Sequence, residues 1–299
     1  MWFFRKRMRP SSEEKPDVRE RQSMVQKFGY DIKFLLFPFS VLLILVSCQT
    51  VPITERGQLS LIPAQQINSM SLDAYGKFKA EHQAVKGTNE AQMVQRVGAR
   101  IQDAVRRYLE QNNLSERISG YEWEFNLFKD DSANAWAMPG GKVAVYTGIL
   151  PVARDEAGLA VVMSHEIAHV IAAHGNERMS QALLTQLGGV ALQTAISQKP
   201  ALTQQLFMTA FGVGTQVGVL LPYSRLQERE ADHLGLIFMA MAGYNPEAAI
   251  GFWQRMTQEK KGAAGPEFLS THPSDEERIR NIRELIPEAM KFYRAAGNS

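Results

Sequence analysis

Two histidines and a glutamate occur together in residues 165–169, whose sequence is HEIAH. Residues four apart on an α-helix lie on one face, so the imidazoles of His165 and His169 can bind a single metal ion. Histidine nitrogen is a common ligand of Zn²⁺, and Glu166, beside the first histidine, can act as a general base for a water molecule. The alternative interpretation is a buried helix whose histidines are satisfied by hydrogen bonds.

The residues around this motif favour metal binding. Asp155 is a candidate N-cap, Gly175 is a candidate C′ residue, and residues 156–174 between them contain no proline. This segment is apolar nearly all round, which is typical of a core helix. Two histidines and a glutamate inside such a helix are costly unless something binds them.

A third metal ligand is predicted further along the chain, in residues 224–232 (SRLQEREAD). A catalytic zinc ion has three protein ligands and leaves a fourth position for water. Glu228 and Asp232 are four residues apart and share a helix face. Glu228 can bind the metal, while Asp232 can accept the ring N–H of a ligating histidine and so fix its tautomer. Glu230 lies on a different face and is a weaker ligand candidate.

Four blocks of the sequence, taken in order, carry a resemblance to a known family. The blocks are NAWAMPGG followed by KVAVYTGIL (134–150), HEIAHV (165–170), SRLQEREAD (224–232), and THPS (271–274) followed by Arg278 and Ile279. Together they resemble the HtpX/BepA group of gluzincin zinc metallopeptidases, which also contains the type 1 CAAX prenyl protease. Within that group the resemblance is greatest to periplasmic lipoprotein members such as LoiP.

The resemblance implies a zinc-dependent endopeptidase with one Zn²⁺ per chain, acting on misfolded or misassembled envelope proteins. It also places His272 near the metal. There His272 could fill the water position and silence the enzyme, or donate a hydrogen bond to the tetrahedral intermediate; a loop histidine that caps the next helix is the alternative. Tyr223, Arg225 and His272 are candidates to assist the metal in stabilising the oxyanion.

The segment before the metal helix predicts a hairpin, with strands over residues 133–138 and 142–147 and a Pro-Gly-Gly turn between them. If the first strand forms a sheet edge beside the zinc, its backbone can pair with an extended substrate. Asn134, Ala135 and Trp136 are then the substrate-binding residues. An ordinary half-buried hairpin explains the pattern equally well.

Hydrophobic spacing elsewhere predicts a helix over residues 88–112, a strand over 121–127, and helices over 246–258 and 274–285. Residues 180–221 predict two apolar helices that pack as a hairpin; a lid or a membrane-contacting surface is the alternative. The predicted fold is α+β and mostly helical, a zincin-like metallopeptidase domain with a small antiparallel sheet beside the metal-binding helix.

The amino terminus predicts export. A basic, polar stretch is followed by FLLFPFSVLLILV (34–46), which is shorter than the roughly twenty residues that span a membrane and matches the apolar core of a secretory signal. Residues 45–48 (LVSC) form a lipobox, and Cys48 is the one cysteine of the chain. Acylation of Cys48 is therefore expected, with an uncleaved anchor as the alternative. Gln49 favours sorting to the outer membrane, and Met24 is a possible true start.

The predicted organisation is a signal peptide (1–47), a lipidated N-terminus and tether (48–70), and a zinc metallopeptidase domain (71–299). We expect a membrane contact through the lipid anchor, facing the periplasm of a Gram-negative bacterium. The net charge is +2, and no basic segment with interleaved aromatic residues is present in the sequence, so nucleic acid is not an expected partner. An envelope chaperone or assembly factor with a latent zinc site is the alternative function.

The lipobox yields a direct test. Cys48→Ala removes the thiol that the acyl chain would modify, so the protein should leave the membrane fraction or accumulate as its precursor. Cell fractionation and mass spectrometry of the mature N-terminus measure both outcomes. An unmodified Cys48 in the mature wild-type chain would reject acylation.

Overall fold

The computed structural model describes residues 48–187, 200–211, 224–259, 268–272 and 276–297, which belong to one compact unit, Cys48–Ser299. Its centre is helix α5 (Glu156–Ile171), in which every residue from Gly158 onward is buried. The Asp155 carboxylate accepts a hydrogen bond from the Gly158 amide, as the predicted N-cap requires. The predicted signal peptide lies outside the described residues.

Helix α5 ends earlier than the sequence predicts. Its C-cap is Ala172, Ala173 adopts a left-handed φ of 58°, and a new helix, α6 (His174–Leu187), begins at once. The prediction of Gly175 as the C′ residue is therefore wrong. Gly175 serves packing instead, because a Cβ at this position would lie 2.2 Å from the ring of Phe211.

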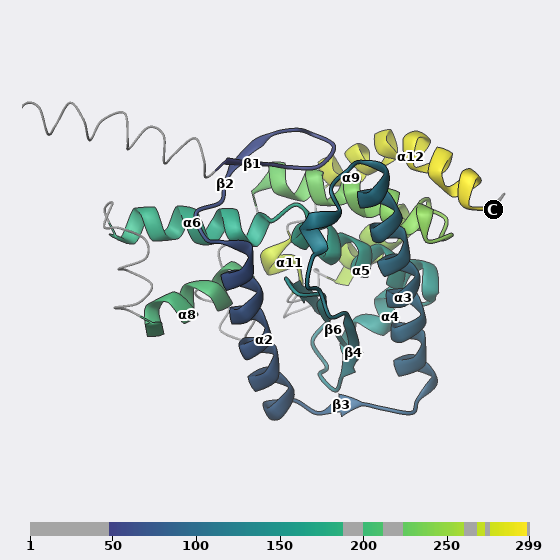
Figure 1. Cartoon of the computed structure of the whole chain (residues 1–299). Helices are drawn as coiled ribbons and strands as arrows, with labels where there is room; N and C mark the ends of the chain where they lie inside the picture. Colours follow the sequence, from purple (N-terminus) through teal and green to yellow (C-terminus); the bar gives the residue numbers. More distant parts are fainter. Residues whose placement is uncertain (1–47, 188–199, 212–223, 260–267, 273–275, 298–299) are drawn as a thin grey trace, which may run out of the picture. The chain divides into compact units, whose positions relative to one another are not determined.

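A layer of helices packs against α5. Helix α9 (Arg225–Met241) lies along it, α12 (Glu276–Gly297) packs on α9, and α3 (Asn89–Gln111) packs on both α5 and α9 (Figure 1). Ser224 and Gln227 form a capping box that fixes the start of α9. These helices, together with α10 (Ala248–Glu259), confirm the helices predicted over 88–112, 246–258 and 274–285, although α12 continues well past the predicted end.

The four-stranded sheet has the order β3-β4-β6-β5 and lies beside α5. Its strands are β3 (Ala84–Val85), β4 (Glu124–Phe128), β5 (Ala135–Met138) and β6 (Lys142–Tyr146). The prediction of an antiparallel sheet is wrong in one pair: β6 inserts between β5 and β4 and runs parallel to β4. The predicted β5–β6 turn is confirmed, since Gly140 and Gly141 both have positive φ, which suits a tight hairpin.

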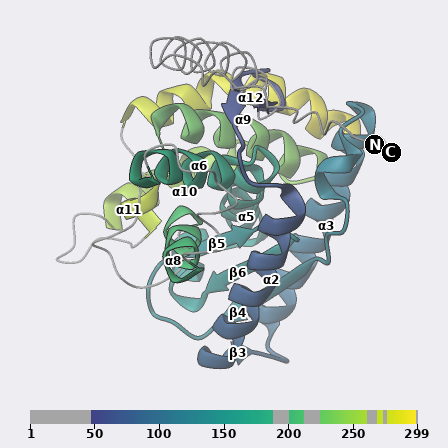
Figure 2. The same ribbon diagram turned by 60° about the vertical axis from the view of Figure 1, so that its left-hand side comes forward.

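Both faces of this sheet are covered. Ala135, Ala137, Val143 and Val145 belong to the core cluster that includes α5, whereas alternate residues such as Trp136 and Tyr146 pack with α2 (Ala64–Glu81) in a second cluster. Figure 2 shows α2 lying across the sheet. The sheet is therefore the middle layer between α2 and α5, which explains why β5 and β6 are buried throughout.

Residues 48–70 are folded, so the prediction of a tether there is wrong. They form the antiparallel strands β1 (Cys48–Thr50) and β2 (Gly57–Leu59) and the first turns of α2. Val51 and Ile67 are buried, and the Gln58 amide donates to the carbonyl of Ala172 at the end of α5. The segment gains enough apolar and polar contacts with the domain to offset the entropy of ordering it.

Two further helices bear on the predicted helical hairpin. Helices α6 and α8 (Pro200–Ala210) pack together, as a hairpin requires, although residues 188–199 and 212–223 lie outside the described part of the chain. No single described helix is long and apolar enough to cross a membrane. The pair Glu156–Ile171 and His174–Leu184, bent by 50°, passes that test together, and its first member is the buried core helix.

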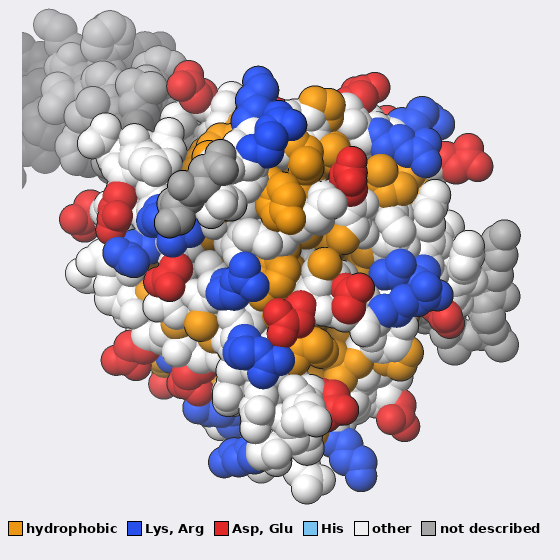
Figure 3. Space-filling view, turned by 90° about the vertical axis from the view of Figure 1, so that its right-hand side faces the viewer, with side chains coloured by type: hydrophobic (Ala, Val, Ile, Leu, Met, Phe, Trp, Pro, Cys, Tyr) orange, Lys and Arg blue, Asp and Glu red, His pale blue; other side chains and the backbone are white. Residues whose placement is uncertain are grey.

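One face of the surface is shown in Figure 3. Lysine and arginine side chains lie there among aspartate and glutamate side chains, with hydrophobic side chains between them. A strongly charged macromolecule would therefore meet no extended area of opposite charge on this face.

The contact between α5 and α9 depends on one glycine. A Cβ at Gly235 would lie 3.1 Å from the backbone nitrogen of His165. Gly235→Val should therefore push α9 away from α5, lower the free energy of unfolding by about 1–3 kcal/mol, and reduce metal content. Chemical denaturation and elemental analysis measure the two effects. Gly76→Ala is the matched control, because Gly76 is exposed on α2 with open space around it; an equal loss in both variants would contradict this reading.

Candidate metal centre

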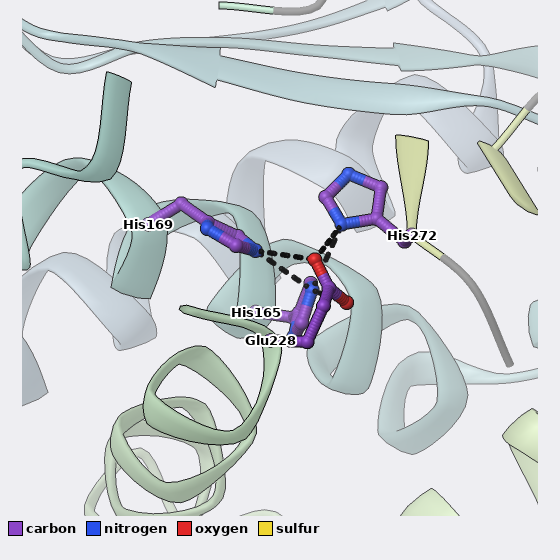
Figure 4. Close-up of side chains that lie close together, drawn as sticks. All are labelled: His165, His169, Glu228 and His272. Atoms are coloured by element: carbon purple, nitrogen blue, oxygen red, sulfur yellow. Dashed lines mark hydrogen bonds and ion pairs between the residues drawn. The ribbon is translucent and has the colours of Figure 1, made fainter. Parts of the chain in front are cut away.

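Four buried side chains converge at the junction of α5, α9 and the end of the short helix α11 (Phe268–Thr271). His165 and His169 come from α5, Glu228 from the first turn of α9, and His272 directly follows α11 (Figure 4). One nitrogen or oxygen atom from each of these residues lies within 4.8 Å of the others. Three elements far apart in sequence therefore place four potential metal ligands around one point.

The spacing of these atoms suits a zinc ion. His165 Nε2 lies 3.1 Å from His169 Nε2, and His169 Nε2 lies 3.3 Å from Glu228 Oε1. His272 Nδ1 lies 2.9 Å from Glu228 Oε1 and 3.2 Å from His165 Nε2. Ligands bound tetrahedrally at 2.0–2.2 Å stand roughly 3.3–3.6 Å apart. A set of three imidazole nitrogens and one carboxylate oxygen at nearly this spacing fits Zn²⁺ in geometry and in donor type.

Glu166 lies beside this cluster without belonging to it. Its carboxylate is buried, and Oε1 is 3.3 Å from His272 Nε2. Burial raises the pKa of Glu166, an effect that outweighs the opposing attraction of His272 and His165. The carboxyl group thus lies next to the potential ligands with an increased affinity for a proton, as a general base near neutral pH requires.

Asp232 occupies the place that the sequence predicts. Its Oδ1 lies 3.0 Å from His165 Nδ1, on the side of the imidazole opposite the cluster. A carboxylate in this position accepts the Nδ1 hydrogen and leaves Nε2 available to a metal.

Arg278, on α12, is a site residue that the sequence analysis missed. It donates to Asp232 and lies 2.6 Å from Glu228 Oε2, and its guanidinium covers the ring of Trp253 at 3.5 Å. Burial would raise the pKa of Glu228, but electrostatic attraction to His272 and Arg278 and hydrogen bonds from His165 and His169 hold this pKa well below its usual range. Because Arg278 closely follows the THPS block, its position in the sequence indicated that it could lie near the site. Nothing in the sequence indicated that it would pair with Glu228 and Asp232 on α9.

His174 and Glu230 form a second group that the sequence analysis missed. His174 Nδ1 lies 2.9 Å from His169 Nδ1, and His174 Nε2 lies 3.0 Å from Glu230 Oε2. Burial would raise the pKa of Glu230, but hydrogen bonds from His174, Arg56 and Thr54 lower it to about 2. The early end of α5 at Ile171 allows His174 to lie beside His169.

The other predicted site residues lie elsewhere. Arg225 has an exposed side chain that pairs with Glu277 at 2.7 Å, so it is not brought to the cluster, and Tyr223 lies outside the described residues. Asn134 and Ala135 are buried at the start of β5, which is an edge strand of the described sheet. The indole N–H of Trp136 points to the Tyr146 hydroxyl at 3.2 Å, so this side chain is part of the core next to α2.

A helix with the HEIAH motif, a glutamate from a second helix and an adjacent buried carboxylate define the metal centre of a metallopeptidase. The chain belongs to peptidase family M48, whose family model matches residues 95–286. The α+β, mostly helical metallopeptidase fold predicted from the sequence is thereby confirmed.

Named proteins of two kinds are similar to the chain. It is 33% identical over 240 residues to the mitochondrial metalloendopeptidase OMA1 of Schizosaccharomyces pombe, covering 80% of this chain and 66% of that protein. It is 29% identical over 278 residues to the human protein OMA1, covering 88% and 49%. It is 32% identical over 171 residues to the β-barrel assembly-enhancing protease of Escherichia coli, covering 54% and 34%.

The chain therefore spans only part of the length of these relatives, between 34% and 66%. The resemblance to the group that contains BepA is confirmed at the level of the family. Its relatives include mitochondrial proteins as well as bacterial ones, so the periplasmic lipoprotein branch stays a prediction.

The geometry makes a prediction for metal content. His165→Ala, His169→Ala and Glu228→Ala should each bind less than one zinc per chain after dialysis, because each removes one donor atom from the cluster. His233→Ala is the control on the same helix as Glu228, since His233 pairs instead with Glu288 at 2.9 Å. Elemental analysis measures the ratio; full zinc content in all three ligand variants would refute the assignment.

Proposed function

We propose that the chain is a zinc-dependent endopeptidase. The observation that carries the proposal is the buried arrangement of His165, His169 and Glu228 around one point, with the carboxylate of Glu166 beside them but outside the ligand set. These three residues would hold the ion. Zinc, when bound, lowers the pKa of a water molecule and polarises a carbonyl group.

The side chains of the protein have separate roles in this proposal. Glu166 accepts a proton from the attacking water and passes it to the leaving amine, for which its raised pKa is suited. Asp232 orients His165, and Arg278 forms an ion pair with Glu228 Oε2. With Oε2 occupied by Arg278, Glu228 offers Oε1 to the metal.

The substrate in this proposal is an extended polypeptide. Strand β5 pairs on one side with β6 and packs against α5, and no strand of the described residues pairs with its other side, where backbone groups lie near the metal helix. Backbone pairing with Asn134, Ala135 and Trp136 would not depend on substrate side chains. This suits a protease of unfolded segments, and the support lies in the backbone of β5 rather than in the side chain of Trp136.

His272 completes the donor set in the arrangement described above. We infer that it occupies the fourth position in a resting state and must leave before water can react. Its ring stacks on Phe268 with a centroid separation of 4.4 Å, and the Phe268 amide donates to the carbonyl of Ala133, which precedes β5. The segment that bears His272 therefore contacts the backbone directly before the residues assigned to substrate binding.

The cellular address is proposed from the lipobox. Acylation at Cys48 would anchor the protein to the outer membrane, facing the periplasm of a Gram-negative cell, and misfolded or misassembled envelope proteins would be its substrates. The relatives from Vibrio cholerae and Escherichia coli that are named for β-barrel assembly support substrates of this kind, whereas the address rests on the lipobox alone. The second candidate, an envelope chaperone or assembly factor with a latent zinc site, is favoured by the position of His272 in the donor set.

Glu166→Gln tests the peptidase function. The change removes the base but no ligand, so zinc content should stay at one per chain while cleavage of unfolded casein falls by about 10²- to 10⁴-fold. Zinc analysis and peptide release are measured on the same preparation. Undiminished cleavage would eliminate Glu166 as the base, and absence of cleavage in the wild type as well as the variant would favour the chaperone.

His272→Ala tests the resting state. Loss of a fourth donor should raise the basal rate of casein cleavage, because the position needed by water becomes free. The rate is compared with that of the wild type at matched zinc content. A lower rate with zinc retained would instead assign His272 to stabilisation of the transition state, and an unchanged rate would remove it from the mechanism.

A further inference from the structure

A small hairpin near the start of the described chain is held in a defined position. Strands β1 and β2 are joined by a loop in which Ile53 and Glu55 have positive φ values of 72° and 50°. The Val51 amide donates to the Arg56 carbonyl at 2.9 Å, which closes the loop. Two non-glycine residues in left-handed conformation are costly, and they persist where surrounding contacts determine the backbone.

The contacts that determine it centre on Arg56. Its guanidinium donates to both carboxylate oxygens of Glu177 on α6, at 2.7 and 2.9 Å. It also donates to both oxygens of Glu230 on α9, at 2.9 and 3.0 Å. Both carboxylates are buried, so two bidentate pairs join the hairpin to α6 and to α9, the helix that carries Glu228. Thr54 adds a hydrogen bond to Glu230 at 2.8 Å.

The contacts continue from Glu230 to a metal ligand. Glu230 Oε2 lies 3.0 Å from His174 Nε2, and His174 Nδ1 lies 2.9 Å from His169 Nδ1. The other nitrogen of His169, Nε2, faces His165 and Glu228 inside the cluster. Arg56, Glu230, His174 and His169 thus form one continuous chain of hydrogen bonds, which we call the Arg56 chain.

The direction of each hydrogen bond follows from the chemistry of the groups. A His169 that binds metal through Nε2 carries its hydrogen on Nδ1 and must donate to His174 Nδ1. A neutral His174 that accepts at Nδ1 carries its hydrogen on Nε2 and donates to Glu230. Glu230 accepts from His174, Arg56 and Thr54, and Arg56 can only donate. Every member therefore supports the tautomer of His169 that leaves Nε2 available to a metal.

We propose that Arg56 is a positioning residue for the metal ligand His169, acting through Glu230 and His174. The inference rests on the zinc site assigned under the proposed function. Asp232 orients His165 by a direct contact. His169 is oriented by His174, which depends in turn on Glu230 and Arg56, and these three residues come from three different elements. The metal centre is consequently coupled to the β1–β2 hairpin, which begins at Cys48.

The test measures metal binding rather than turnover. Arg56→Gln should weaken zinc binding by the purified full-length chain by about 10- to 100-fold in competition with a chelator, the cost typical of losing a group that orients a ligand. It should also alter the visible absorption bands of the Co²⁺-loaded protein, which report the ligand geometry. Arg56→Lys, which keeps the charge but cannot form both bidentate pairs, should fall between the wild type and Arg56→Gln.

Arg117→Gln is the matched control. Arg117 also holds the hairpin, by donating to the Thr50 carbonyl, and it donates to the Ile171 carbonyl at 3.1 Å, but it makes no contact with Glu230 or His174 among the described hydrogen bonds. Its zinc affinity and Co²⁺ spectrum should match the wild type. Equal losses in Arg56→Gln and Arg117→Gln would show that docking of the hairpin matters and the Arg56 chain does not, which would overturn the proposal.

Thermal unfolding of the metal-free proteins and zinc binding by the wild-type chain are measured as well. Thermal unfolding identifies any variant that fails to fold; if Arg56→Gln fails, Arg56→Lys is used for the test. Wild-type affinity and spectrum in both Arg56 variants would refute the inference. A wild-type chain that binds no zinc would instead refute the proposed function, so the two failures are distinguishable.

Discussion

The burial of charged groups between α5 and α9 is the constraint on which the rest of the structure depends. Histidines and carboxylates excluded from water are stable only when each has a partner of suitable charge and geometry. The structure supplies these partners from several directions: α9 provides Glu228 and Asp232, α12 provides Arg278, and the hairpin provides Arg56. The packing of α5 against α9 and the pairing of their buried charges therefore depend on the same close approach of the two helices, which Gly235 allows.

The surroundings of the two helix α5 histidines differ in an informative way. His165 meets a carboxylate directly, and that carboxylate is held by Arg278. His169 meets a second histidine, which is held by Glu230 and in turn by Arg56. The first arrangement stays among helices of the catalytic core, whereas the second reaches the β1–β2 hairpin, which spans Cys48 to Leu59. A change in the position of the hairpin would therefore alter the hydrogen bonds that orient His169 but not those that orient His165.

Much of the fold could be predicted because its signals are local. The N-cap at Asp155, the Gly140-Gly141 turn and the hydrophobic spacing of α3 each depend on residues close together in the chain. The parallel pairing of β6 with β4 could not be predicted in this way, since strand order depends on which strands meet in space. Residues 48–70 were mistaken for a tether because their prolines and glycine are typical of linkers, while their stabilising contacts come from distant helices.

By itself, the sequence determined which side chains could form the metal centre: His165 and His169 are four residues apart on one helix, and Glu228 and Asp232 are four apart on another, so helix geometry directs each pair to one face. Only the tertiary structure decided which groups surround that centre. Arg278, His174 and Arg56 reach it through the packing of α12, the break after α5 and the β1–β2 hairpin. Periodicity describes the faces of single helices, but it contains no information on which distant side chain supplies the partner for a buried charge.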